Sequence, residues 1–92
     1  MNRYKSGARK EYAVLRAWRA CGASCARSAG SHGLWDISVV HDGYVFLIQV
    51  KAGRKHEDAN LALFRKLKVR ENVRKQLYHY TRGQTKPRIE EL

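Results

Sequence analysis

Cysteine is scarce in this chain of 92 residues, which contains only Cys21 and Cys25. Two cysteines are too few for a disulfide scaffold, and a small intracellular protein usually keeps them reduced. A zinc site with His32 nearby has weak support, because three residues separate the cysteines and no second Cys/His pair follows. Buried free thiols are the simpler expectation.

A long apolar run is also missing. No segment approaches the roughly 18 to 20 apolar residues that a membrane span needs. Residues 1–12 are charged and lack the apolar centre of a secretory signal. We therefore expect a soluble, cytoplasmic protein with no membrane partner. Residues 1–92, of which 43% are hydrophobic, are expected to form a single domain with one modest core.

Acidic residues are few: eight Asp and Glu stand against nineteen Lys and Arg, which gives a formal net charge of +11. Residues 28–50 carry no Lys or Arg, whereas residues 1–27 carry seven and residues 65–88 carry nine. This division predicts a sheet core in the middle and phosphate-binding surfaces at both ends, with nucleic acid as the partner. The alternative is a merely basic, soluble surface.

Two segments have helical patterns. Ser6 can cap a helix with its body at Arg9–Cys21, and Gly22 stands at the expected C-terminal position. Leu15 and Trp18 form the inward stripe of this helix, and Glu11 lies on the same stripe. The second helix is predicted from Glu57 to about Val69.

Strand signals fill the rest of the chain. The Asp42-Gly43 pair suits a two-residue type I′ turn and predicts a hairpin between two strands. A final segment with Pro87 could pair back as an edge strand. The predicted strands are residues 24–29, 34–40, 44–51, 76–82 and 87–92, which gives the order α-β-β-β-α-β-β.

The hairpin brings polar residues to one face. If the turn is centred on Asp42 and Gly43, paired residues have numbers that sum to 85, so Asp36 faces Gln49. Lys51, two positions beyond Gln49, returns to that face. The other face of the strand carries Phe46, Ile48 and Val50, which can pack under a helix.

A carboxylate, an amide and an ammonium that converge suit phosphodiester hydrolysis. A carboxylate with neutral oxygens can hold Mg²⁺, and a lysine can orient or activate the attacking water. A surface salt bridge between Asp36 and Lys51 explains the same spacing equally well.

Four stretches resemble the archaeal Holliday junction resolvases, members of the PD-(D/E)XK nuclease superfamily. They are GARKEY at 7–12, RSAGSHGLWDI at 27–37, LIQVKAG at 47–53 and, more weakly, KPRIEEL at 86–92. The resemblance implies a restriction-endonuclease-like α/β fold with a central mixed sheet flanked by helices. It also implies a homodimer that cuts four-way DNA junctions with Mg²⁺, for which Mn²⁺ could substitute.

The resemblance also implies roles for individual residues. Asp36, Gln49 and the Val50 carbonyl would bind metal, with Glu11 as an outer or second ligand, and Lys51 would position or activate water. Arg27 and Ser31 would contact the scissile phosphate. Further contacts with branched double-stranded DNA are expected from Arg9, Lys10, Arg54 and Lys55.

Two features depart from the family pattern. Gln49 stands where the superfamily usually has Glu or Asp, and the loss of a charge should weaken metal binding. The segment between Lys51 and Gln76 is short, so the dimer surface formed by the second helix is expected to be trimmed. These departures leave two alternatives open: a branched-DNA-binding module without strong catalysis, and a related nuclease that acts on flaps, ends or RNA.

The aromatic residues have structural and functional interpretations. Tyr78 and Tyr80 lie within the basic run and could stack on opened bases, or pack in the core, which is the more common role for at least one of them. Trp18 and Trp35 are expected to be packed.

Overall fold

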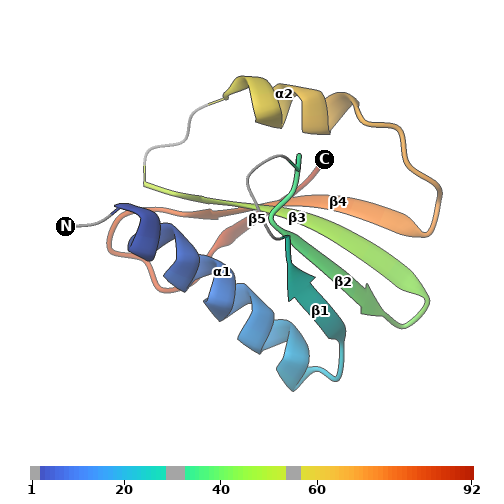
Figure 1. The fold of residues 1–92 in the computed structure, drawn as a ribbon, viewed down its shortest axis with the longest axis horizontal. Coiled ribbons are helices and arrows are strands. Elements are labelled where there is room, and N and C mark those ends of the chain that lie inside the picture. The colour runs from blue at the N-terminus through green and yellow to red at the C-terminus, as the bar shows by residue number, and fades with distance from the viewer. Residues whose placement is uncertain (1–2, 29–32, 54–56) are drawn as a thin grey trace.

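The computed structural model describes residues 3–28, 33–53 and 57–92, and Figure 1 shows them as three layers. A five-stranded sheet lies between two helices, and a separate apolar cluster lies on each side of the sheet. No helix in the described ranges is long and apolar enough to cross a membrane. The elements are α1 (Arg3–Ala20), β1 (Ser24–Arg27), β2 (Ile37–His41), β3 (Tyr44–Ala52), α2 (Ala59–Lys66), β4 (Val73–Tyr80) and β5 (Arg88–Glu91).

The order of the strands in the sheet follows their order in the chain, β1-β2-β3-β4-β5. Neighbouring strands are antiparallel except β3 and β4, which are parallel and are joined through α2. A parallel pair needs such a crossover, since a tight turn can join only antiparallel strands. The predicted mixed sheet, the order α-β-β-β-α-β-β and the closing edge strand are thus confirmed.

The hairpin between β2 and β3 has the predicted register. Asp42 and Gly43 have φ angles of 52° and 80°, and a type I′ turn requires positive φ at both central residues. The pairs run from His41 and Tyr44 to Ile37 and Ile48, so their numbers sum to 85 as expected.

The apolar cluster under α1 contains the inward stripe of that helix. Val14 and Leu15 are almost fully buried against the sheet, and Trp18 stacks on Phe46 with the ring centroids 4.7 Å apart. Ile48 and Val50 belong to the same cluster, which confirms the apolar face of β3. Tyr78 and Tyr80 are also buried here, so both pack in the core and neither is free to stack on bases. The remaining buried members are Ala23, Ile37 and Val39.

The cluster under α2 is smaller. Leu61 and Phe64 of the helix are fully buried against Leu47 and Leu77 of the sheet. Trp35 packs at the edge of this cluster, near Phe64. Its indole N–H donates a 2.9 Å hydrogen bond to Ser38 Oγ, as a packed tryptophan requires.

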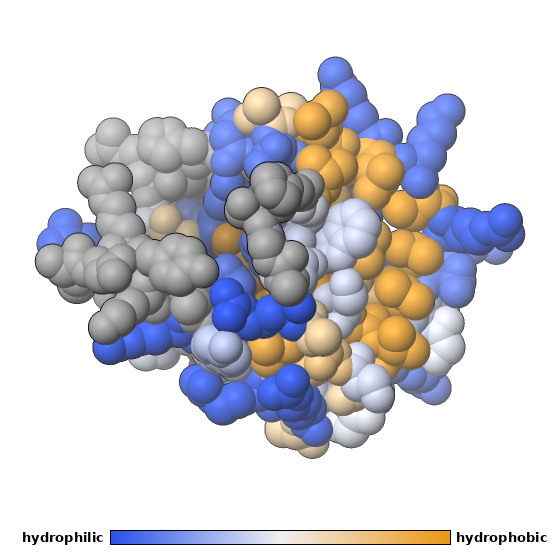
Figure 2. Space-filling model, viewed as in Figure 1, coloured by the Kyte–Doolittle hydropathy of each residue, from blue (hydrophilic) through white to orange (hydrophobic). Residues whose placement is uncertain are grey.

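Apolar residues form a continuous area on the face shown in Figure 2. This area lies right of centre, over the β2–β3 hairpin and the end of α2, with hydrophilic residues to its left and further hydrophilic side chains that project along the right edge. Val40 and Tyr44 on the hairpin, and Leu63 and Val69 on and after α2, are the large apolar residues exposed in these elements.

Several predicted boundaries are wrong. α1 begins at Arg3, so Ser6 lies inside the helix and is not its cap, although Gly22 does follow the helix end with a φ of +86°. α2 ends at Lys66 rather than near Val69. The other differences are a later start of β2, at Ile37, an earlier start of β4, at Val73, and a shorter β1 that ends at Arg27.

The two thiols differ in environment. Cys25 is half-buried, and its thiol lies 3.7 Å from the Leu15 carbonyl, to which it donates. Cys21 is exposed after the end of α1, so the expectation of a buried thiol is wrong at that position.

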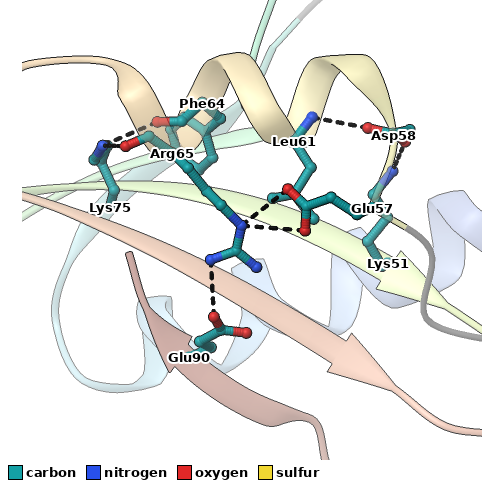
Figure 3. A network of polar contacts seen from close by, with 8 residues as sticks. All are labelled: Lys51, Glu57, Asp58, Leu61, Phe64, Arg65, Lys75 and Glu90. Atoms are coloured by element: carbon teal, nitrogen blue, oxygen red, sulfur yellow. Dashed lines mark hydrogen bonds and ion pairs between the residues drawn. The ribbon is translucent and has the colours of Figure 1, made fainter.

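The C-terminal end of α2 is held by a lysine from the sheet. Lys75 on β4 is 7% exposed, and its ammonium donates to the carbonyls of Phe64, Arg65 and Leu67 at 2.9, 2.7 and 2.7 Å. Two of these bonds are drawn in Figure 3. Burial lowers the pKa of Lys75 from its ordinary value. The final carbonyls of a helix have no partner within it, so Lys75 supplies the donors that α2 lacks.

Replacement of this ammonium by an apolar group of similar length should destabilise the fold. Lys75→Met leaves three carbonyls without their donor and should lower the free energy of unfolding by about 2 to 4 kcal/mol. Urea denaturation measures the change. Lys68→Met, which removes an exposed charge nearby, should stay within about 0.5 kcal/mol of wild type. Equal effects of the two substitutions would contradict the capping role.

Candidate functional site

The predicted site residues that the structure describes lie on β3, β1 and α1 and directly before β2. Gln49 and Lys51 lie on β3, Asp36 directly precedes β2, Arg27 ends β1 and Glu11 lies on α1. Side chains alternate along β3, so the apolar residues Ile48 and Val50 face α1 whereas Gln49 and Lys51 lie on the side of α2. The apolar cluster under α1 therefore packs against the side of β3 opposite to Gln49 and Lys51.

Asp36 is fixed in position by three hydrogen bonds. Its amide donates to Ile48 O at 2.8 Å, and its own carbonyl accepts from Ser28 N at 2.8 Å. Its carboxylate Oδ2 accepts from the Val50 amide at 2.7 Å. The side chain thus takes a backbone donor of β3 at the point where the β2–β3 ladder ends.

Burial raises the pKa of Asp36, and the negative charge of Glu11 acts in the same direction. The Val50 amide, Lys51 and Arg27 oppose this rise in the pKa of Asp36 without cancelling it. A half-buried anion with a second carboxylate nearby is electrostatically unfavourable, and a bound cation would relieve that cost.

The side-chain amide nitrogen of Gln49 has a hydrogen-bond partner, whereas its oxygen has none among the described residues. The residue is 6% exposed, and its Nε2 donates to the Leu34 carbonyl at 3.2 Å. Its Oε1 is buried and has no hydrogen-bond partner among the described residues. An unsatisfied buried acceptor costs about 1 to 3 kcal/mol, so such an atom calls for a ligand or another explanation. The Gln49 oxygen fits the neutral oxygen ligand that the sequence predicts.

Lys51 forms its ion pair with Asp58 and not with Asp36. Asp58 lies just before α2, and its Oδ2 accepts from the Lys51 ammonium (Figure 3). The alternative interpretation of the spacing, a surface salt bridge between Asp36 and Lys51, is therefore wrong. Lys51 is still close enough to Asp36 to act on its carboxylate electrostatically.

Glu11 and Arg27 are joined directly. Arg27 Nε donates to Glu11 Oε1 at 2.8 Å, and Arg27 Nη1 donates to the Tyr12 hydroxyl at 3.0 Å. The guanidinium also lies over the Tyr12 ring, 4.7 Å from its centroid. The hydrogen bonds to Glu11 and Tyr12 raise the pKa of Arg27 above its ordinary value. One oxygen of Glu11 is thus engaged by arginine, whereas the sequence predicts that this carboxylate serves a metal.

Of the other residues predicted to contact DNA, the structure describes Arg9 and Lys10. Arg9 is exposed, and Lys10 lies over the Tyr80 ring, 4.8 Å from its centroid. Ser31, Arg54 and Lys55 lie outside the described residues, as does His32. Within the described ranges, no group of three or more His, Cys, Asp or Glu residues could hold a metal ion.

Three partners of the site were missed by sequence reasoning. Asp58 could have been found, because an aspartate that directly precedes an apolar-periodic run is a signal for a helix N-cap. Tyr12 and the Leu34 carbonyl carry no sequence signal for their contacts with Arg27 and Gln49.

Comparison with protein-family models, with curated proteins and with solved structures gives no match to this chain. The functional interpretation therefore depends on the chemistry of the site.

The raised pKa of Asp36 predicts how the stability of the fold changes when its carboxylate is replaced. The folded state binds the Asp36 proton more tightly than the unfolded state, so this group contributes stability at low pH that is lost as pH rises through its folded pKa. Asp36→Asn should therefore raise Tm at pH 7, and the difference from wild type should shrink as pH falls toward 4.

Bound Mg²⁺ should make wild type more stable than Asp36→Asn. If Asp36 binds Mg²⁺, the ion should stabilise wild type by about 2.7 kcal/mol at one hundred times its dissociation constant, and Asp36→Asn by much less. Thermal melts with and without Mg²⁺ across this pH range measure both effects. An equal response of the two proteins to Mg²⁺ would remove Asp36 from the metal site.

Proposed function

We propose that this chain is a Mg²⁺-dependent DNA endonuclease with a restriction-endonuclease-like fold that resolves four-way junctions by phosphodiester hydrolysis. The observation that carries the proposal is the presence of a half-buried carboxylate and a buried, unsatisfied oxygen at the same end of the β2–β3 hairpin. Asp36 is held against β3 with a raised pKa, and the buried Oε1 of Gln49 has no partner among the described residues. The mixed sheet, with one helix on each side, is compatible with the proposed fold.

Asp36 and Gln49 would hold the metal through one anionic and one neutral oxygen, a donor set that Mg²⁺ accepts. The Val50 carbonyl is a further candidate ligand, and Glu11 would act as an outer or second ligand. The ion would polarise a phosphoryl oxygen and make a bound water more acidic. Mn²⁺, which prefers the same oxygen donors, could substitute for Mg²⁺.

The remaining residues would act on phosphate and water. Lys51 would orient the attacking water, and Arg27, held in place by Glu11 and Tyr12, would contact the scissile phosphate together with Ser31. Arg9, Lys10, Arg54 and Lys55 would contact the flanking backbone. The net charge of +11 supports a polyanionic substrate, since neutralised phosphates dominate affinity for nucleic acid.

Resolution of a junction requires two symmetric cuts, so we expect a homodimer in which each subunit makes one cut. Leu63 and Val69, which are exposed on and after α2, would be candidate contacts if this shortened segment still forms part of the interface.

A branched-DNA-binding module with weak or no catalysis is the second candidate. Two observations favour it: the second ligand of the motif is a neutral amide, and Arg27 engages one oxygen of Glu11. Each lowers the negative charge available to a divalent cation. In this case the basic surface would bind DNA, and the site would not hydrolyse it.

The deciding experiment compares substrates and metals. Purified protein is incubated with labelled four-way junction, flap, linear duplex, single-stranded DNA or RNA, in Mg²⁺, Mn²⁺ or EDTA. We expect metal-dependent cleavage of the junction and none by Asp36→Asn, which should still bind the junction because the basic residues supply the affinity. Binding without cleavage in any metal would establish the second candidate. Preferred cleavage of flaps, ends or RNA would change the substrate class.

Gln49→Glu tests the neutral ligand. If Gln49 Oε1 binds the metal, an added negative charge should tighten Mg²⁺ binding and lower the Mg²⁺ concentration for half-maximal cleavage, by about tenfold if the gain is 1.4 kcal/mol. A Mg²⁺ titration of cleavage at fixed salt measures this shift. An unchanged or higher metal requirement would count against Gln49 as a ligand, since the new carboxylate would then only repel Asp36.

A further inference from the structure

Asp58 makes two different contacts with its two carboxylate oxygens. Oδ1 accepts a 2.8 Å hydrogen bond from the Leu61 amide, which caps the N-terminus of α2. Oδ2 accepts from the ammonium of Lys51. One carboxylate therefore connects the start of α2 to the motif lysine of β3, as Figure 3 shows.

Several contacts other than the Lys51–Asp58 ion pair hold α2 in place. At the far end of α2, Lys75 donates to three carbonyls. Arg65 in the last turn of α2 binds Glu57 at 3.0 Å and Glu90 of β5 at 2.9 Å. Leu61 and Phe64 are fully buried under the helix. With α2 held in these ways, its N-cap stays in place when Lys51 leaves.

Lys51 can leave at low cost. Its side chain is 27% exposed and that of Asp58 is 46% exposed, and ion pairs with this much solvent contact contribute only about 0 to 1 kcal/mol. A lysine side chain carries its charge on a flexible stem of four carbons, so the ammonium can turn to another anion without movement of β3. The carboxylate lowers the positive potential that Lys51 offers to a phosphate for as long as they are paired.

We propose that Asp58 is a positioning residue that holds Lys51 in a resting state and competes with the substrate phosphate for its ammonium. This inference rests on the proposed nuclease function. Substrate phosphate displaces the Asp58 carboxylate from Lys51, and the lysine then turns toward the scissile group. Asp58 keeps its hydrogen bond to Leu61 throughout, so α2 does not unwind when the ion pair breaks.

Asp58→Asn separates the two contacts. Asparagine caps helices as well as aspartate does, so the bond to Leu61 is kept while the charge that holds Lys51 is removed. A matched control is Glu57→Gln, which removes one negative charge from the neighbouring position, where the partner is Arg65 and not Lys51. Lys51→Met provides a background in which no ammonium is present to be released.

The measurement is binding of a fluorescent four-way junction in EDTA, at one fixed salt concentration, for wild type, both charge variants, Lys51→Met and the double variant Lys51→Met/Asp58→Asn. Tm and circular dichroism verify that α2 remains folded. We expect Asp58→Asn to bind about two to five times more tightly than Glu57→Gln, the range that corresponds to an exposed ion pair. In the Lys51→Met background, Asp58→Asn should give no gain beyond that of Glu57→Gln.

Other outcomes overturn the inference in distinguishable ways. Equal gains for Asp58→Asn and Glu57→Gln would mean that only total charge matters. In cleavage assays with Mg²⁺, a lower kcat of Asp58→Asn at unchanged KM would mean that Asp58 supports the reactive position of Lys51. If wild type binds the junction and does not cleave it, the nuclease proposal fails and the binding comparison still decides the role of Asp58. If wild type binds no nucleic acid, both proposals fail together.

Discussion

The candidate site depends on the alternation of side chains along β3. Ile48 is buried and Val50 is half-buried on the side of α1, so Gln49 and Lys51 are held on the side of α2 without freedom to exchange faces. A shift of one residue in the pairing of β2 and β3 would bury the lysine and expose the apolar residues. The packing that stabilises the sheet is therefore the same constraint that places the polar groups. Asp36 adds to it directly, because its carboxylate binds the amide of Val50.

The parts of the fold that could be predicted are those with local physical causes. The hairpin register follows from Asp42 and Gly43, whose positive φ angles fix which residues of the two strands oppose each other. The end of α1 follows in the same way from Gly22. The end of α2 could not be predicted, because Leu67 continues the helical spacing of apolar residues. The donor that satisfies the last carbonyls is Lys75, a residue of the next strand.

The same distinction between local and tertiary causes applies to the candidate site. The positions of Asp36, Gln49 and Lys51 at one end of the hairpin were predictable from spacing, but their contacts were not. Gln49 donates to a carbonyl fifteen residues away, Lys51 pairs with the cap of α2, and Arg27 reaches back sixteen residues to Glu11. Each contact requires two elements to be docked first. Periodicity therefore indicates which residues share a face, and tertiary packing decides which of them touch.

The agreement between strand order and chain order has a consequence for how the protein folds. The antiparallel pairs join residues at most 16 positions apart, whereas the parallel β3–β4 pair joins residues 28 positions apart, such as Val45 and Val73, and is therefore expected to form more slowly than the hairpin. Asp36, Gln49, Lys51 and Asp58 all lie on the hairpin or on the crossover that follows it. These four residues can thus be brought together before β5 closes the far edge of the sheet. Sequence changes in that last strand should alter the lifetime of the native state more than the arrangement of the site.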